Sequence, residues 1–207
     1  MAEQTRHLLA LVNDVLDLTK IEAGDLQVAF QPFALSDALQ RCRELVTPLA
    51  QRKGLHIEIR VAPDIGQIVS DRRRVEQVLI NLVGNGIKFT DRGQVTVLAD
   101  VLPPGGWPGG RLAVHPFGRA IRLQIVDSGI GMKPEDLGKL FNAFRQLDSG
   151  LSRQHEGTGL GLVICERLLQ AMGGDIIVQS QWGAGSTFIV MLPLAPPSSS
   201  AGDGSYT

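Results

Sequence analysis

The sequence predicts an α/β protein: a two-layer sandwich in which a mixed sheet of about five strands is covered on one face by about three helices. Two observations support this fold class. Short segments in which apolar residues alternate, typical of strands with one buried face, recur along the chain. Longer segments with apolar residues at helical spacing lie between them. With 207 residues, 43% hydrophobic and 20% charged, the chain suits one globular domain with a fragment of another.

The first half of the chain alternates between helices and strands. We expect Gly24 to end the first helix and Ser36 with Asp37 to open the second. The buried face of that second helix is expected to carry Leu39, Cys42, Val46 and Leu49. The expected segments, in chain order, are a helix over 5–24, a strand over 26–30, a helix from Ser36 to just before Gly54, a strand over 55–61 and a helix over 72–89.

The second half continues the same mixture. A stretch with four Pro and five Gly, residues 102–118, is expected to be a loop or hairpin excursion. The expected segments are strands over 95–101 and 121–127, a short amphipathic piece over 137–144, a helix over 160–172, and strands over 175–181 and 186–192. We therefore divide the chain into an N-terminal helix (1–24), a main domain (25–194) and a linker tail (195–207).

Composition excludes several classes of protein. Twenty Lys and Arg against 21 Asp and Glu give a net charge of −1, which argues against nucleic-acid binding through bulk positive charge. We find no apolar run long enough to span a membrane and no signal peptide, and we expect no membrane contact by this chain. Two cysteines rule out a disulfide scaffold and suit a reducing, cytoplasmic setting.

The third helix carries the first candidate site. Asn81, Asn85 and Lys88 are spaced four and three apart, so they share one face of the helix with Gln77. An ordinary solvated face would explain this pattern, but such faces usually carry Glu and Lys, because Asn is a poor helix former. Amide oxygens can bind Mg²⁺, and an ammonium can bind phosphate. Gly86 inside the helix indicates either a close backbone approach or simple packing.

Asp127 begins the second candidate site. It has the same strand parity as Ile121, Leu123 and Ile125, so we expect it to point to the buried side of the sheet. A structural Asp that caps the following turn is one reading. The other is an acceptor for an exocyclic amino group such as that of adenine, with Gly129 and Gly131 letting the backbone pass close to a flat ring.

Two further glycine-rich segments complete the set. Residues 156–162 (EGTGLGL) open a helix, where backbone N–H groups can bind an anion. Their spacing fits neither the dinucleotide fingerprint nor the phosphate-binding loop that ends in Gly-Lys. Residues 183–188 (GAGSTF) taken alone predict only a turn into a strand.

Taken in order, these motifs resemble those of the ATP-binding domain of sensor histidine kinases, in the superfamily shared with gyrase-type topoisomerases and heat-shock-90 chaperones. The resemblance covers about residues 26–193 and implies the Bergerat-type ATP-binding fold. The matching segments are DRRRVEQVLINLVGNGIKFT (71–90, N box), DSGIGM (127–132, G1 box), FNAF (141–144, F box), EGTGLGL (156–162, G2 box) and GAGSTF (183–188, final glycine box).

The resemblance implies a role for each matching residue. Asn85 would hold Mg²⁺, with Asn81 supporting the site, and Lys88 would contact the phosphates of ATP. Asp127 would accept from the adenine amino group, beside Gly129 and Gly131. Residues 133–156 would form a lid over ATP. The remaining implied nucleotide contacts are Phe141 and Phe144 as lid anchors, Arg153 toward the outer phosphate, Gly157, Thr158, Gly159, Leu160 and Gly161 around the phosphates, and Ser186 or Thr187 near adenine.

The resemblance favours kinase chemistry over hydrolysis. The gyrase-like branch carries a Glu four residues before its Mg-binding Asn, whereas this chain has Asn81 there, and an amide cannot act as a base toward water. We therefore expect a protein histidine kinase that transfers the γ-phosphoryl group of ATP. A non-catalytic nucleotide-binding or dimerisation module and a hydrolytic ATPase of the same superfamily are the alternatives.

The expected acceptor lies outside this sequence. The family's acceptor His is followed by an acidic residue and then Arg-x-Pro, and none of His7, His56, His115 and His155 has that context. Residues 7–24 resemble the second helix of the family's phosphoacceptor hairpin. We therefore expect a chain that begins within that hairpin and does not phosphorylate itself. Expected partners are ATP or ADP, the hairpin of the same or a partner protomer, and a response regulator or receiver domain. A homodimer and an optional membrane anchor are expected only of the full-length protein.

Overall fold

A mixed five-stranded sheet forms the centre of the molecule in the computed structural model, which describes residues 12, 15–104, 106, 118–142 and 159–195. The order of its strands is β2-β4-β5-β7-β6, and only the β2–β4 pair is parallel. The strands are β2 (His56–Val61), β4 (Gln94–Leu102), β5 (Ala120–Asp127), β6 (Asp175–Gln181) and β7 (Gly185–Pro193). This confirms the predicted α/β class.

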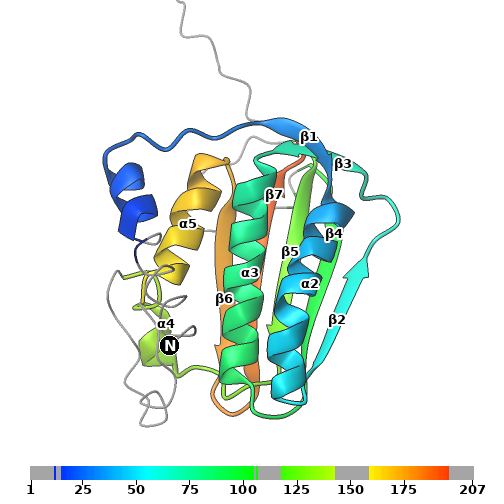
Figure 1. The fold of residues 1–207 in the computed structure, drawn as a ribbon, viewed down its shortest axis with the longest axis vertical. Coiled ribbons are helices and arrows are strands. Elements are labelled where there is room, and N and C mark those ends of the chain that lie inside the picture. The colour runs from blue at the N-terminus through cyan, green and yellow to red at the C-terminus, as the bar shows by residue number, and fades with distance from the viewer. Residues whose placement is uncertain (1–11, 13–14, 105, 107–117, 143–158, 196–207) are drawn as a thin grey trace, which may run out of the picture.

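Three helices cover one face of the sheet (Figure 1). They are α2 (Leu35–Arg52), α3 (Arg72–Phe89) and α5 (Gly161–Ala171). Alternate residues of the central strands, such as Leu123 on β5 and Val190 on β7, point toward the helices and are buried. A smaller apolar cluster that includes Ile189 and Met191 lies on the other face. The alternation that predicted the strands therefore also identifies which side of the sheet faces the main core.

The segment 26–30, predicted as a strand, is not one. Leu26 and Val28 do pack against the core, but the backbone pairs with no strand there. The N–H of Ala29 instead donates to Oδ2 of Asp71 at 3.1 Å. Strand β1 (Gln31–Ala34) begins just after it and pairs antiparallel with β3 (Gln67–Ser70) in a separate two-stranded sheet. The apolar alternation reflected the packing of Leu26 and Val28 rather than ladder pairing, and Phe30, its third member, is exposed.

Helix α2 ends just before Gly54, as predicted, but it departs from expectation at its first residue and in its buried face. It begins at Leu35, and no side chain caps it, so Ser36 and Asp37 lie inside its first turn. Its buried face ends at Ala50 rather than Leu49, whose side chain is 48% exposed. Successive residues of a helix are rotated by about 100°, so Ala50, four residues after Val46, continues the buried stripe.

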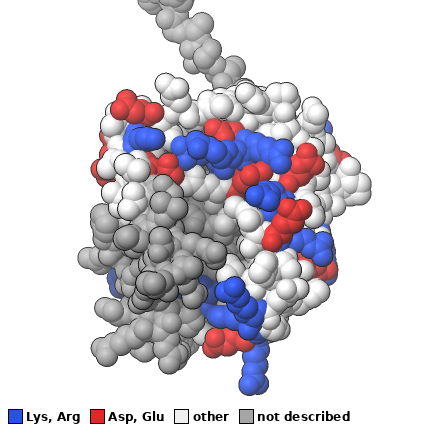
Figure 2. Space-filling model, in the orientation of Figure 1, with Lys and Arg blue, Asp and Glu red and all other residues white. Residues whose placement is uncertain are grey.

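The N-terminal helix lies beside α5 at the edge of the domain (Figure 1), where residues 15–22 are helical. Leu18 is buried in the main core. Gly24 has φ +74° and ends the helix, as predicted. No helix among the described residues is long and apolar enough to cross a membrane. On the face shown in Figure 2, basic and acidic side chains are interspersed rather than separated by sign.

Candidate functional site

The candidate site lies at one edge of the sheet, where β5 ends at Asp127 and β7 begins at Gly185. Asp127 pairs across the ladder with Ser186 of β7 and with Val95 of β4. Helix α3 packs against β4 and β5, and its neighbour α5 completes the helical layer. The sheet thus brings three of the sequence motifs to one place.

Asp127 is a buried carboxylate with built-in donors. Its residue is 6% exposed, as the strand parity predicts. Oδ1 accepts from the backbone N–H of Gly129 at 2.9 Å and of Ser186 at 3.3 Å. Burial raises the pKa of Asp127, and the hydrogen bonds from Gly129 and Ser186 offset only part of that rise. The two backbone donors meet at Oδ1, and the Ser186 side chain is a further hydrogen-bond partner of the carboxylate.

The glycines after Asp127 are needed by the chain's own backbone. A Cβ at Gly129 would collide with the carbonyl of Phe89, and Gly131 has φ +64° and lies against the carbonyl of Gln181. The N–H of Ile130 donates to the Phe89 carbonyl at 3.2 Å. The loop after β5 is therefore packed directly on the end of α3.

Gly86 shows why α3 can lie so close to the sheet. A Cβ at this position would be 3.1 Å from Cγ1 of Val95 and 3.5 Å from Cβ of Asp127. A larger residue would push the helix away from the strand end. Of the two explanations that the sequence left open, close packing of the helix on the sheet is the one that applies.

The polar face of α3 runs past this edge. Asn81, Asn85 and Lys88 are all partly buried. Nδ2 of Asn81 lies 3.5 Å from the carbonyl oxygen of Gly161, the first residue of α5. Burial lowers the pKa of Lys88, whose Nζ lies 4.9 Å from the centroid of the Phe89 ring. The face is therefore partly covered, because Asn81 meets the first residue of α5 and Lys88 is partly buried beside Phe89.

Ser186 and Thr187 lie on opposite faces of the sheet. Ser186 is buried and has the parity of Phe188 and Val190, which pack in the main core. Thr187 has the parity of Ile189, which packs in the cluster on the other face. Only Ser186 therefore shares a side with Asp127.

Ser180 of β6 is a site residue that the sequence did not reveal. Its Oγ accepts from the N–H of Met132 at 2.8 Å, lies 2.9 Å from the Gly185 carbonyl oxygen and is 3.0 Å from Oγ of Ser186. It therefore ties the loop after Asp127 to the start of β7. A single serine in a strand gives no local signal of such a role, because its partners come from two other segments.

The other predicted site residues are placed as follows. Phe141 is partly buried and packs against the main core, and Leu160 is buried just before α5. Gly159 has φ +69°. The predicted amphipathic piece over 137–144 overlaps the short helix α4 (Pro134–Leu137) only at Leu137, and residues 138–142 form turns and a bend. Phe144, Arg153, Gly157, Thr158 and most of the predicted lid over 133–156 lie outside the described residues.

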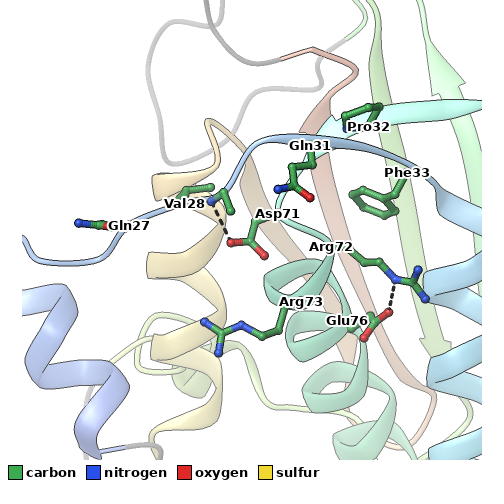
Figure 3. A pocket seen from close by; sticks show the side chains of 10 residues that line it. Gln27, Val28, Gln31, Pro32, Phe33, Asp71, Arg72, Arg73 and Glu76 are labelled. Atoms are coloured by element: carbon green, nitrogen blue, oxygen red, sulfur yellow. Dashed lines mark hydrogen bonds and ion pairs between the residues drawn. The ribbon is translucent and has the colours of Figure 1, made fainter.

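A groove of about 690 Å³ lies at the opposite end of α3 (Figure 3). Segment 27–33 and the first turns of α3 line it. Three of its four charged side chains are engaged: Asp71 caps α3 through the Arg74 N–H, and Arg72 pairs with Glu76 at 2.8 Å. It contains none of the predicted site residues. Within the described residues, no cluster of three His, Cys, Asp or Glu side chains could hold a metal ion without other ligands.

Comparison with known proteins gives consistent results. Residues 70–196 match the family described as "Histidine kinase-, DNA gyrase B-, and HSP90-like ATPase". The chain is 41% identical over 183 residues to signal transduction histidine-protein kinase BarA of Escherichia coli (strain K12). The matched region covers 88% of this chain and 19% of that protein. It is 40% identical over 192 residues to hybrid signal transduction histidine kinase B of Dictyostelium discoideum. This match covers 92% of this chain and 9% of that protein.

A solved structure agrees with these sequence matches. The crystal structure of full-length ShkA in complex with AMPPNP superposes with a TM-score of 0.78 at 33% identity, covering 94% of this chain and 37% of that one. This chain therefore spans less than half the length of each of these three relatives.

Proposed function

The chain belongs to the histidine kinase-, DNA gyrase B-, and HSP90-like ATPase family, and we propose that it is the ATP-binding catalytic domain of a sensor histidine kinase. One observation carries the proposal. The buried carboxylate of Asp127 is packed against α3 at Gly86, so an acceptor for an amino group lies beside the helix that carries Asn85 and Lys88. An adenine and a phosphate chain need these two chemistries side by side.

The residues present fit ATP with Mg²⁺. The carboxylate of Asp127 would accept from the adenine amino group, with Ser186 beside it on the same side of the sheet. Lys88 would contact the phosphates, and the N-terminal turn of α5 would offer backbone N–H groups to them. The amide oxygen of Asn85 would hold Mg²⁺, whose other ligands would be phosphate oxygens and water. When bound, Mg²⁺ would neutralise charge on the phosphates.

The proposed reaction is phosphoryl transfer to a histidine. An imidazole nitrogen of the acceptor forms a bond to the γ-phosphorus, the bond from phosphorus to the β,γ-bridging oxygen breaks, and ADP leaves with that electron pair. The acceptor would belong to a phosphoacceptor hairpin of the same or a partner protomer in the full-length dimer. His56, the histidine among the described residues, is exposed at the start of β2. Relay to an aspartate of a response regulator or receiver domain would follow.

Asn81 supports transfer over hydrolysis. Its side-chain amide faces the first residue of α5 and has no basic atom that could take a proton from water. The chain's own groups would thus bind, orient and stabilise charge without activating a water molecule. Catalysis would come mainly from positioning and electrostatic stabilisation.

The proposal is tested in two steps. Calorimetry with ATP, in the presence and absence of Mg²⁺, measures binding by this chain. A separately expressed phosphoacceptor hairpin from a full-length relative is then added with γ-labelled ATP. Acid-labile, base-stable label on the hairpin is expected. Binding without transfer would favour a non-catalytic module, steady release of phosphate would favour an ATPase, and absence of binding by the folded chain would refute the proposal.

A further inference from the structure

The ammonium group of Lys53 binds the end of α3. Its Nζ lies 3.0 Å from the carbonyl oxygen of Ile87, 2.7 Å from that of Lys88 and 3.2 Å from that of Thr90. An ammonium has three N–H donors, and each has a carbonyl here. Lys53 follows the last residue of α2, so the end of one helix supplies a cation to the carbonyls at the end of another.

This arrangement has a simple physical cause. The last carbonyls of a helix have no partners within it, and their dipoles make that end negative. The Lys53 side chain is 32% exposed, and the N–H groups of Lys53 and Gly54 donate back into α2 at 3.0 and 3.1 Å. Gly54 has φ +66°, which turns the chain away into β2. The backbone that carries Lys53 is therefore fixed by its own helix end.

The turn that Lys53 holds supports both halves of the proposed nucleotide site. Lys88, the phosphate-side cation, lies in it. The carbonyl of Phe89, in the same turn, accepts from Ile130 and packs against Gly129, in the loop after Asp127. A shift of this turn would displace the cation and the adenine-side loop together.

We propose that Lys53 is a positioning residue of the nucleotide site, which holds the last turn of α3 so that Lys88 and the loop after Asp127 keep their relative places. The inference rests on the proposed ATP-binding function. It predicts a role for a residue that touches neither nucleotide nor acceptor. A purely stabilising cap would instead change the melting temperature alone.

The test compares Lys53→Met with Lys53→Arg, which keeps a cation with several donors, and with Arg52→Met, which removes a neighbouring exposed cation of the last turn of α2. Calorimetry gives the affinity for Mg-ATP, and amide hydrogen exchange by NMR follows Ile130. We expect Lys53→Met to weaken binding about tenfold and to speed exchange at Ile130. Both controls should stay within about twofold of the wild type.

The amide of Val75 is the internal reference, because it donates to Asp71 at the other end of α3. Unchanged affinity, or faster exchange at Val75 and Ile130 alike, would overturn the proposal. If the wild type does not bind ATP, the proposed function fails, while exchange at Ile130 still tests the hold of Lys53 on α3. If Lys53→Met does not fold, Lys53→Gln, which keeps an amide donor, takes its place with the same criteria.

Discussion

The buried carboxylate of Asp127 lowers the stability of the fold at neutral pH, but the same group is the proposed acceptor for adenine. Burial raises its pKa, so its charged form is less favourable in the folded chain than in the unfolded one. A carboxyl group whose pKa is higher in the folded chain than in the unfolded chain contributes stability at low pH. That contribution is lost as the pH rises through the folded pKa. At neutral pH this side chain therefore opposes folding, and a binding role would account for its presence.

Asp127→Asn should separate these effects. The asparagine oxygen can still accept from Gly129 and Ser186, while its NH₂ would face the adenine amino group as a second donor. We expect the variant to melt at or above the wild-type temperature at pH 7, and to bind ATP roughly 10- to 100-fold more weakly. Calorimetry and thermal unfolding measure both. Asp64→Asn, at an exposed position, is the control. Unchanged ATP affinity would eliminate the adenine-acceptor role.

The metal role of Asn85 gives a second residue-scale prediction. An amide oxygen that binds Mg²⁺ matters only when the metal is present. Asn85→Ala should therefore weaken ATP binding about tenfold with Mg²⁺ and far less with EDTA. Titrations under the two conditions provide the comparison. Equal losses would show that Asn85 acts on the nucleotide or on the fold rather than through the metal.

Sequence reasoning succeeded at residues whose signal is local. Strand parity predicted the burial of Asp127, and helical periodicity placed Asn81 and Asn85 on one face of α3. It missed Ser180 and Lys53, because their partners come from other segments and only the fold brings them together. It could not choose between Ser186 and Thr187 either, since that choice depends on which face of the sheet the helices cover.

At the scale of elements, the same distinction holds. The bounds of α3 and β6 were predicted to the residue, because strong periodicity and glycines mark them. The strand expected over 26–30 was wrong, because apolar alternation reports burial and says nothing about a pairing partner. Strand β3 was not predicted, since four residues give too short a pattern.

The N-terminal helix is joined to α3 by a clasp, which we define as Asp17, Arg74 and Gln77. Oδ1 of Asp17 lies 3.0 Å from Nη1 of Arg74, and Oδ2 accepts from Gln77 at 2.8 Å. Burial alone would raise the pKa of Asp17, but the hydrogen bonds from Gln77 and Arg74 outweigh it and lower the pKa. The Arg74 side chain is 7% exposed, so loss of its partner would leave a buried cation.

Asp17→Asn should loosen the N-terminal helix from the domain by about 1–3 kcal/mol, because a neutral amide replaces a charged hydrogen-bond acceptor. Hydrogen exchange of the amides in 15–22 measures this at pH 7. A carboxyl group whose pKa is lower in the folded chain than in the unfolded chain stabilises the fold at pH values above its unfolded pKa. That stability is lost as the pH falls through the folded pKa. Wild-type docking should therefore weaken below about pH 4. Asp25→Asn, at an exposed position beyond the helix, should leave the exchange rates of 15–22 unchanged. If Asp17→Asn also leaves them unchanged, the clasp does not hold the N-terminal helix on the domain.

At the scale of the whole molecule, the proposed site should couple nucleotide binding to global stability. Its parts come from β5, β7, α3 and α5, so a bound ligand joins segments from both halves of the chain. A ligand that binds only the folded state at 100 times its dissociation constant stabilises it by about 2.7 kcal/mol. For a chain of this size, that predicts a rise in melting temperature of roughly 5–10 °C with saturating Mg-ATP.

The rise in melting temperature with Mg-ATP also tests whether ATP binds at the proposed site or elsewhere on the chain. Asp127→Asn should melt at or above the wild-type temperature without nucleotide. At the same ATP concentration its shift should be about half that of the wild type for a tenfold loss of affinity and about one sixth for a hundredfold loss, because the stabilisation depends on the ratio of ATP concentration to dissociation constant. Lys53→Met, with its tenfold weaker binding, should show about half the wild-type shift. Differential scanning calorimetry at several ATP concentrations gives the comparison. Equal shifts in the wild type and in Asp127→Asn would mean that ATP stabilises the chain from somewhere other than this edge of the sheet.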